Sequence, residues 1–206
     1  MLALYSRPET AGTIIHCALE MAGTPHRIIR VTKASDASVS PSDYLTLNPT
    51  GTVPTLVDGD LVLYETVAIL EHLIETVPGL GPRTGEPHRP ELHFWLGWLA
   101  NNPMAAFYRW FKADQMIAAD AVSALRAGAV TSLRSQGEWL ERELLDRHWL
   151  VGAAPTAADI YLQCLQSWAE EIDDLRFGGD VVAEHSARTR NLPGVAAALA
   201  QESASA

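Results

Sequence analysis

The stretch of residues 47–70 limits the possible folds more than any other part of the chain. It opens with the turn signals of Asn48-Pro49-Thr50-Gly51 and continues through Val53-Pro54 into two short apolar runs separated by Asp58-Gly59. Asp-Gly between apolar runs is typical of a β-hairpin. Because Pro54 has no backbone N–H to donate, it belongs at the start of the first strand, and the bond before it is of the kind that adopts the cis form.

A helix is predicted directly after this hairpin, beginning at Glu65-Thr66. Its apolar residues recur with helical spacing and share one face (Ala68, Ile69, Leu73, Ile74 and Val77). The start of a helix presents unpaired N–H groups and the positive end of the helix dipole. This part of the chain therefore suits the binding of a small carboxylate.

The residues before the hairpin predict a βαβ unit. Leu2–Tyr5 is expected to form a buried strand, a helix from Thr13 is expected to stop at Gly23, and His26–Val31 alternates like a second strand. Two strands joined by one helix at this length are expected to be parallel. A weakly structured loop is expected over Lys33–Ser42. With the hairpin and its helix, residues 1–77 are predicted to form an α/β sandwich of βαβ-α-ββα order.

Strand signals end after this first part of the chain. Residues 78–87 form a linker rich in Pro and Gly, and residues 88–206 are predicted to be all-helical. A first helix is expected over Pro90–Trp110 with a kink at Pro103, and a second over about Ile117–Leu145. The predicted fold class is therefore an α/β domain followed by an all-α domain.

Two further predictions concern the last third of the chain. Thr156-Ala157-Ala158-Asp159 precedes an apolar run, which is the pattern of a helix N-cap whose third residue reaches back. We interpret Asp159 as part of this cap and not as a catalytic carboxylate. The final residues, Gln201–Ala206, are expected to be disordered.

The order Asn-Pro-x-Gly-x-Val-Pro, hairpin, Glu-Thr-x-Ala-Ile resembles the glutathione-binding half of the cytosolic glutathione transferase superfamily, and Thr-x-x-Asp resembles the capping box of its helical half. The resemblance implies a thioredoxin-like domain and glutathione as co-substrate. It implies that the backbone of Val53, before cis-Pro54, holds the cysteinyl part, and that Glu65 and Thr66 hold the γ-glutamyl end. Thr52 is included in the binding set, although the family usually has basic or amide side chains before Val-Pro. The alternative is that these residues are only scaffolding of the fold.

The resemblance also implies a group near the end of the first strand that stabilises the glutathione thiolate, since the thiolate is the nucleophile. Cys17 is expected in mid-helix and Ala11 has no donor, so a cysteine-type catalyst is excluded. Glu9 as an anion would repel the thiolate. Thr10 is our first candidate and Tyr5 the second. Weaker candidates are Ser6, Thr13 and the backbone N–H groups of Ala11 and Gly12.

Each of these candidates also has a structural interpretation. Thr10 is equally the kind of residue that caps the following helix, and Tyr5 the kind that packs at a strand end. Arg7 offers a charge or is a solvated loop residue. In the helical part, Asn101 and Asn102 have two interpretations: their amides bind glutathione, or they relieve the kink at Pro103. The aromatic residues nearby line an apolar pocket or fill the core (Phe107, Tyr108, Trp110 and Phe111).

Composition excludes several classes of partner. The net charge of −10 and the pI of about 5.1 argue against nucleic acid and anionic membrane surfaces. No apolar run reaches 18 residues and no secretory signal is recognised, so a cytoplasmic protein is expected. The two cysteines, Cys17 and Cys164, are predicted to be buried thiols. The seven histidines show no His-x-x-x-His spacing, and no metal is expected.

The resemblance implies conjugation of reduced glutathione to small hydrophobic electrophiles, a detoxification chemistry, by a homodimer. One alternative is a glutathione-dependent disulfide reductase or peroxidase, because the catalytic loop is atypical. The other is a non-catalytic family member that binds glutathione or another ligand.

Overall fold

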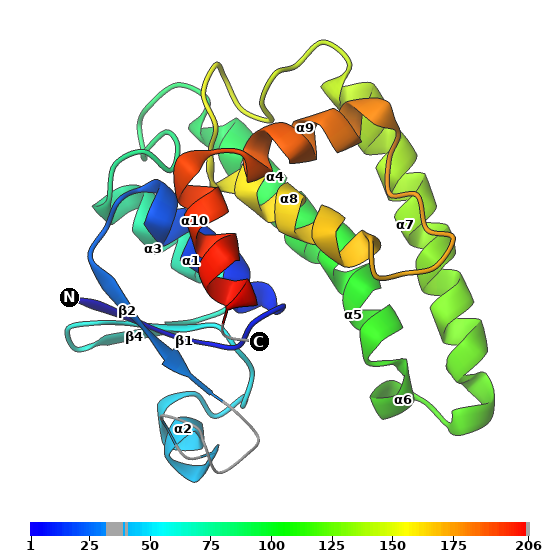
Figure 1. The fold of residues 1–206 in the computed structure, drawn as a ribbon, viewed down its shortest axis with the longest axis horizontal. Coiled ribbons are helices and arrows are strands. Elements are labelled where there is room, and N and C mark those ends of the chain that lie inside the picture. The colour runs from blue at the N-terminus through cyan, green and yellow to red at the C-terminus, as the bar shows by residue number, and fades with distance from the viewer. Residues whose placement is uncertain (32–38, 40, 205–206) are drawn as a thin grey trace. The chain divides into compact units, whose positions relative to one another are not determined.

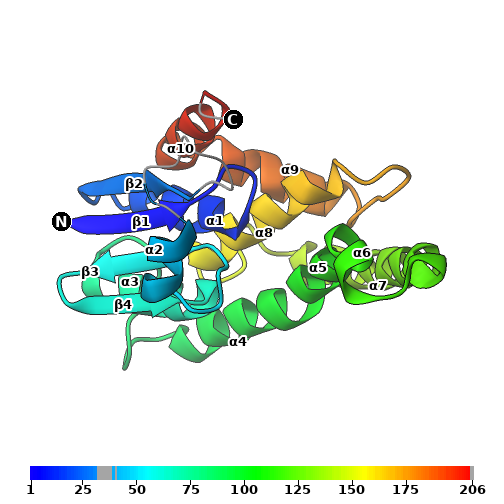
Figure 2. The same cartoon turned by 90° about the horizontal axis from the view of Figure 1, so that it is seen from below.

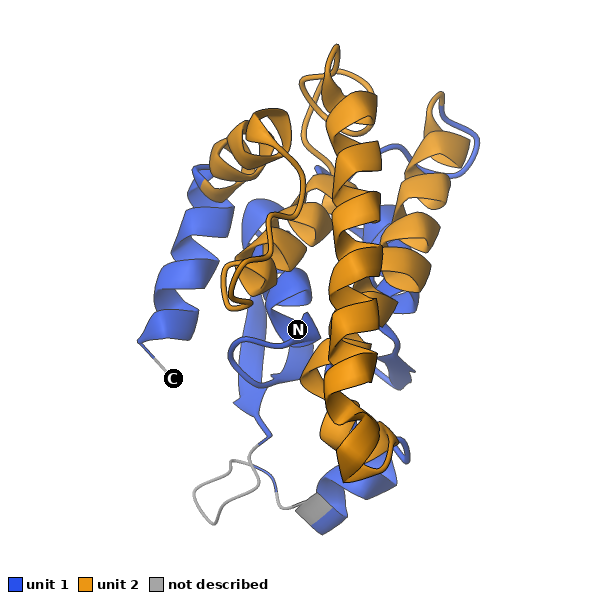
Figure 3. Cartoon of the chain, turned by 90° about the vertical axis from the view of Figure 1, so that its right-hand side faces the viewer, with its two compact units in different colours: residues 1–86, 191–206 blue, residues 87–190 orange. Residues whose placement is uncertain are grey.

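The computed structural model describes residues 1–31, 39 and 41–204 (Figure 1). Two compact units are formed: unit 1 comprises Met1–Glu86 and Asn191–Ala206, and unit 2 comprises Pro87–Arg190 (Figure 3). The predicted boundaries, 1–77 and 88–206, stay a prediction about domains. By packing, the last helix lies with unit 1.

Unit 1 is built on a mixed four-stranded sheet with the order β2-β1-β3-β4. The strands are β1 (Leu2–Ser6), β2 (His26–Arg30), β3 (Thr55–Asp58) and β4 (Leu61–Tyr64). β1 runs parallel to β2 and antiparallel to β3, and β3 and β4 form an antiparallel hairpin. The βαβ unit, the hairpin and the mixed sheet of the thioredoxin-like fold are thus confirmed.

Four helices belong to unit 1: α1 (Ala11–Met21), α2 (Pro41–Leu47), α3 (Thr66–Thr76) and α10 (Pro193–Ser203). α1 contacts α3, β1 and α10, and the apolar side chains of α1 and α3 form a buried core (Ile14, Ile15, Leu19, Ile69, Leu70 and Leu73). α1 begins two residues before the predicted Thr13. Residues 33–38 and 40 of the predicted loop lie outside the described residues, and Ser42 already belongs to α2.

The prediction that the chain is disordered from Gln201 was wrong for Gln201–Ser203, because α10 continues through these residues. α10 runs beside α1 (Figures 1 and 2), and a side chain at Gly194 would lie 2.5 Å from the backbone of Met21. Glu202 is buried, lies 2.6 Å from His16 Nδ1 and pairs with Arg30. Burial raises the pKa of Glu202, but the hydrogen bond with His16 and the charge of Arg30 outweigh it, so the pKa lies below its ordinary value.

Unit 2 consists of helices only, among the residues described there. They are α4 (Arg89–Leu99), the π-helical turn η1 (Ala100–Met104), α5 (Ala105–Phe111), α6 (Ala113–Met116), the 3-10 turn η2 (Ala119–Ala121), α7 (Val122–Leu144), α8 (Ala157–Ala169) and α9 (Asp180–Arg190). α5 packs on α7, and α8 packs on α4 and α9. None of the described helices combines the length and the apolar composition that crossing a membrane requires.

Pro103 lies inside η1, between α4 and α5. Proline lacks the N–H of a regular helix and clashes with the preceding turn, which accounts for the π-helical turn at the predicted kink. The side-chain amides of Asn101 and Asn102 donate to the carbonyls of Gly97 and Trp98, at 2.9 and 3.1 Å. Both side chains therefore bond the helix around the kink, in line with the structural interpretation.

The capping box of α8 has the predicted form. Thr156 Oγ1 accepts a hydrogen bond from the backbone N–H of Ala158, and Asp159 Oδ2 accepts from the N–H of Thr156 at 2.7 Å. Asp159 Oδ1 in addition accepts from the N–H of Leu150 at 2.8 Å and lies 2.7 Å from His185 Nε2. The carboxylate is fully buried and its lone pairs are used within the fold.

Candidate functional site

One edge of the sheet brings together the segments that the sequence analysis singled out. Tyr5 of β1 pairs with Thr55 of β3, which in turn pairs with Tyr64 of β4. The residues next to these pairs, Pro54 before β3 and Glu65 after β4, therefore lie at the same edge as the end of β1. The loop that leads to the start of α1 leaves the sheet at this edge too.

The bond between Val53 and Pro54 is cis, and the residues before it are held from within the fold. The carbonyl oxygen of Thr52 accepts hydrogen bonds from Asn48 Nδ2 at 2.9 Å and from Tyr44 Oη at 2.5 Å. Asn48 and Tyr44 both also contact Thr55 Oγ1, at 3.0 and 2.8 Å. Buried polar groups with all partners present fix the backbone, so the path of residues 52–54 is set before any ligand binds.

Asn48 contributes more to this loop than its turn signal indicated. Its Oδ1 accepts hydrogen bonds from the N–H of Thr50 at 3.0 Å and from Thr50 Oγ1 at 2.8 Å, while its amide nitrogen donates to Thr52 and Thr55. The sequence analysis treated Asn48 as part of a turn and did not consider Tyr44. The Asn-Pro pair was the available signal for Asn48, and nothing local to Tyr44 marks its role.

Glu65 stands at the start of α3 in an unusual backbone conformation, with φ 79° and ψ 119°. A residue with a side chain seldom adopts positive φ, and such conformations cost about 1–3 kcal/mol and cluster at ligand sites. The Glu65 side chain is exposed and makes no capping hydrogen bond. The N–H groups at the start of α3 are therefore not capped by Glu65, and they lie at this edge of the sheet together with its exposed carboxylate.

The loop between β1 and α1 contains the predicted catalytic residues. Thr10 is the N-cap of α1: its hydroxyl donates to the carbonyl of Arg7 at 2.7 Å and accepts from the N–H of Gly12 at 3.2 Å. This is the capping geometry that the structural interpretation expected. The hydroxyl proton of Thr10 is already engaged, so stabilising a thiolate would require it to leave Arg7.

The other hydroxyl candidates have different surroundings. Ser6 is fully buried, and its hydroxyl lies 3.2 Å from the carbonyl of Arg7. Thr13 Oγ1 is buried and has no hydrogen-bond partner among the described residues, and the same holds for Arg7 Nε. The ring of Tyr5 is half-buried, with its centroid 5.9 Å from that of Tyr44. The loop and the first turn of α1 thus contain two buried polar atoms without a hydrogen-bond partner among the described residues.

Gly12 allows this loop to pack against β1. A side-chain carbon at Gly12 would lie 1.9 Å from Ser6 Oγ and 2.8 Å from Ser6 Cβ. The sequence analysis considered only the N–H group of Gly12. Its small size is what allows α1 to begin so close to the end of β1.

The aromatic residues predicted as a pocket divide into core and surface. Phe107 is fully buried and its ring packs edge-on against those of Trp168 and Phe177. Tyr108 is exposed. The ring of Trp110 lies under the guanidinium of Arg126. Phe107 is therefore a core residue of unit 2.

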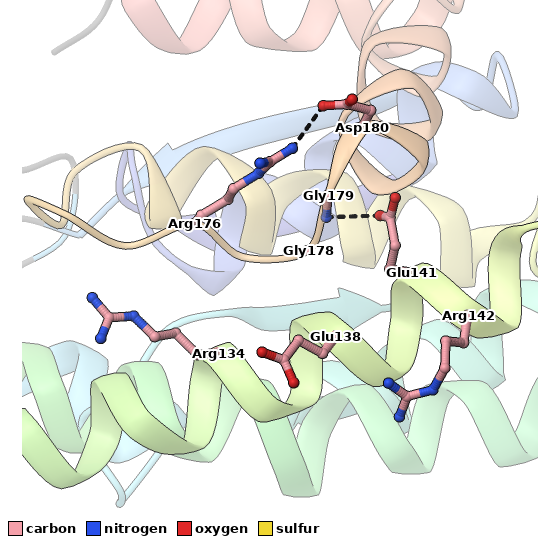
Figure 4. Close-up of a pocket in the computed structure, with 8 residues that line it drawn as sticks. All are labelled: Arg134, Glu138, Glu141, Arg142, Arg176, Gly178, Gly179 and Asp180. Carbon is pink, nitrogen blue, oxygen red and sulfur yellow. Dashed lines mark hydrogen bonds and ion pairs between the residues drawn. The ribbon is translucent and has the colours of Figure 1, made fainter.

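Figure 4 shows a polar hollow on unit 2, lined by charged side chains and glycines (Arg134, Glu138, Glu141, Arg142, Arg176, Gly178, Gly179 and Asp180). The Glu141 carboxylate accepts hydrogen bonds from the N–H groups of Gly179, Val181 and Val182, at 2.7 to 3.0 Å. Burial raises the pKa of Glu141, but these bonds and the charge of Arg176 lower it below its ordinary value. Glu141 thus caps the start of α9, which is a structural role.

Comparison with known proteins agrees with this geometry. Residues 13–76 match the family model described as "Glutathione S-transferase, N-terminal domain". A glutathione S-transferase of Xanthomonas campestris is 30% identical over 173 residues, covering 82% of this chain and 83% of that protein. A solved glutathione S-transferase from Xylella fastidiosa superposes with a TM-score of 0.87 at 25% identity, covering 98% of this chain and 99% of that one.

A sphingomonad glutathione S-transferase solved in complex with glutathione superposes with a TM-score of 0.84 at 28% identity, covering 98% of both chains. Sequence identity of this degree to the Xanthomonas protein over most of the chain identifies the family, and the fold and the cis bond before Pro54 agree with it. The chain belongs to the glutathione S-transferase family.

Proposed function

We propose that this protein binds reduced glutathione at the sheet edge of unit 1 and transfers it to small hydrophobic electrophiles. The observation that carries the proposal is the fixed backbone of Thr52, Val53 and Pro54 beside the uncapped Glu65 at the start of α3. An exposed edge of backbone suits an extended peptide, and a helix start with a free carboxylate suits an amino acid end. The glutathione complex of the sphingomonad relative supports the same ligand.

Within this proposal the backbone of Val53 binds the cysteinyl part of glutathione, and Glu65 and Thr66 bind the γ-glutamyl end. Glu65 supplies a negative charge for an ammonium group, and Thr66, the first residue of α3, supplies an N–H and a hydroxyl for a carboxylate. Arg7 Nε, buried without a partner among the described residues, is available as a further donor to the anionic ligand. Thr52 belongs to the same backbone segment, residues 52–54, and is exposed.

Calorimetric titration with glutathione tests the binding site. Glu65→Gln and Thr66→Ala are each expected to weaken binding by about 1–3 kcal/mol, the cost of a lost hydrogen bond to a charged group. Asp60→Ala is the matched control, because Asp60 is an exposed carboxylate at the turn of the same hairpin, away from the edge. Unchanged isotherms for both site variants would refute the assignment.

The thiolate of bound glutathione is proposed to be stabilised by Thr10, with Tyr5 as the second candidate. Thr10→Ala is expected to slow conjugation at neutral pH by roughly ten- to a hundredfold, since a hydrogen bond to a charged group contributes about 1.5–3 kcal/mol. Thr10→Ser should retain most of the activity, and Tyr5→Phe should change it little. Because Thr10 also caps α1, the unfolding free energy is measured alongside, with a loss of about 1 kcal/mol expected for Thr10→Ala only.

A second candidate function is favoured by the engaged hydroxyl of Thr10. If its proton stays with Arg7, the protein binds glutathione without a donor for the thiolate and is a non-catalytic member, or acts on glutathione disulfide or peroxides. Assays with a chlorinated nitroaromatic and with hydroxyethyl disulfide distinguish conjugation, reduction of disulfides and binding without catalysis. We also propose that the protein is cytoplasmic and forms a homodimer. Sedimentation at the monomer mass of 22.4 kDa would contradict the dimer.

A further inference from the structure

Three side chains with metal-binding atoms meet at the end of the unit 1 sheet that lies opposite the proposed glutathione site. They are His16 and Glu20 of α1 and His26, the first residue of β2, which pairs with Leu2 at the start of β1. The atoms that they offer all lie within 4.8 Å of one another. This cluster takes no part in the proposed transferase chemistry, so its arrangement needs an explanation of its own.

The distances within the cluster leave space for an ion. Glu20 Oε1 lies 4.0 Å from His16 Nε2 and 3.7 Å from His26 Nε2. These separations are longer than good hydrogen bonds. Two nitrogen or oxygen ligands bound to Zn²⁺ at about 2.0–2.1 Å in a tetrahedral site lie about 3.3–3.4 Å from each other. A small contraction of the cluster would therefore bring the three atoms to metal-binding positions.

Both histidines are oriented by hydrogen bonds at the other ring nitrogen. His26 Nδ1 lies 2.7 Å from the carbonyl oxygen of Thr24, and His16 Nδ1 lies 2.6 Å from Glu202 Oε1. Carbonyl and carboxylate oxygens only accept, so Nδ1 is the donor in these two contacts, and Nε2 of each ring is turned toward Glu20. Nε2 of His16 also contacts Gln201 Oε1, at 3.1 Å. This is the arrangement of metal-binding histidines, whose second nitrogen donates to a carboxylate or a backbone carbonyl.

Burial and charge also suit a cation. The side chain of His16 is fully buried and that of His26 is 9% exposed, while Glu20 is 27% exposed and leaves a route for entry. The cluster contains the carboxylate of Glu20, and the carboxylate of Glu202 lies beside it, where it pairs with His16 and Arg30. Glu20 lies in the last turn of α1, where the negative end of the helix dipole attracts positive charge.

We propose that His16, Glu20 and His26 bind a divalent transition metal ion, with Zn²⁺ as the best match for two imidazoles and a carboxylate. Gln201 Oε1, 3.1 Å from His16 Nε2, or a water completes the four ligands. The ion would connect α1 to β2 directly, and through Glu202 and Gln201 it would secure α10 to both. The site is structural, and the sequence analysis missed it because it considered only His-x-x-x-His spacing.

The test is calorimetric titration of ZnCl₂ into the full-length protein at neutral pH, after removal of metal by a chelator and without a histidine tag. One Zn²⁺ per chain is expected to bind. Glu20→Gln and His26→Gln should each lower the affinity at least tenfold. Glu202→Gln leaves the three ligands in place but changes the partner of His16 and of Arg30, and it should lower the affinity about 10- to 100-fold. Circular dichroism checks that each variant is folded.

His72→Gln is the matched control. His72 Nε2 lies 2.9 Å from Asp58 in the same unit, and this histidine–carboxylate pair has no third ligand within the part of the chain that the structure describes. This variant should bind Zn²⁺ like the wild type, and the wild type loaded with Co²⁺ should show the visible absorption of tetrahedral cobalt. The proposal is overturned if the wild type binds no Zn²⁺. It is equally overturned if the ligand variants bind as tightly as His72→Gln.

Discussion

Replacement of Asp159 tests whether this buried carboxylate is the structural centre of unit 2. Asp159→Ala would leave the N–H groups of Leu150 and Thr156 and the ring of His185 without their acceptor, at a position with no exposed surface. Removing one partner from a buried charged network costs about 3–5 kcal/mol. Thr156→Ala removes only the capping hydroxyl and should cost about 1 kcal/mol. The loss of unfolding free energy is therefore expected to be about three to five times larger for Asp159→Ala than for Thr156→Ala.

Tryptophan fluorescence during urea unfolding measures this difference. All six tryptophans lie in Pro87–Arg190, so their fluorescence reports the unfolding of unit 2. Glutathione binding to Asp159→Ala, measured at a temperature where the variant is folded, should equal that of the wild type. An unfolding free energy within about 0.5 kcal/mol of the wild type, in the range of ordinary surface substitutions, would refute the structural role. A folded, stable variant without enzymatic activity would instead make Asp159 a functional carboxylate.

Three further predictions follow from contacts in the two units. Gly12→Ala places a carbon 1.9 Å from Ser6 Oγ and should destabilise unit 1 by about 1–3 kcal/mol, measured by unfolding followed with far-ultraviolet circular dichroism. Gly97→Ala, in mid-helix with open space around it, should be neutral or stabilising. Equal effects of the two substitutions would contradict this prediction. Asn48→Ala removes a hydrogen bond to the carbonyl of Thr52 and should weaken glutathione binding at least tenfold. Thr46→Ala, which removes an exposed hydroxyl on the same segment, should leave binding unchanged. Equal isotherms for the two variants would speak against a backbone of residues 52–54 that is preorganised for glutathione. The pKa of Glu141 is lowered in the folded protein from an ordinary value of 4.5, so Glu141 stabilises unit 2 above that pH and loses this effect as the pH falls through its folded pKa. The difference in unfolding free energy between wild type and Glu141→Gln should therefore shrink below about pH 4.5, and a constant difference would contradict the assignment.

Much of the fold was predictable because its signals are local. Asp58-Gly59 between apolar runs determined the hairpin, and the spacing Thr156-x-x-Asp159 determined the start of α8, since each pattern is completed by hydrogen bonds within a few residues. The binding segment of the candidate site belongs to this class too. Val53-Pro54 and Glu65-Thr66 flank one hairpin, so once the hairpin is predicted, their positions at the same edge of the sheet follow from it.

Features that depend on distant residues were not predictable in the same way. The end of α10 has an Ala-rich sequence with little amphipathic pattern, and it is ordered by Glu202, whose partner His16 lies 186 residues earlier. Tyr44 was overlooked because its hydrogen bond to Thr52 becomes visible only once α2 and the cis-proline loop are placed together. The alternatives for Thr10 were stated correctly as cap or catalyst, and the structure supplies the capping bonds without testing the catalytic role.

The helix α1 connects the two proposed sites through the direction of its dipole. Its first turn contains no acidic residue and stands at the edge with Pro54 and Glu65, so its positive end is left for the thiolate of an anionic ligand. Its last turn contains no basic residue and carries Glu20 beside His26, so its negative end is left for a cation. His16 and Glu20 lie five and nine residues after Ala11, so at about 1.5 Å per residue the proposed metal site lies roughly 8–14 Å along the helix from its start. A metal ion at this cluster would occupy the negative end of the α1 dipole and the anionic ligand its positive end, so both ligands can use the same helix.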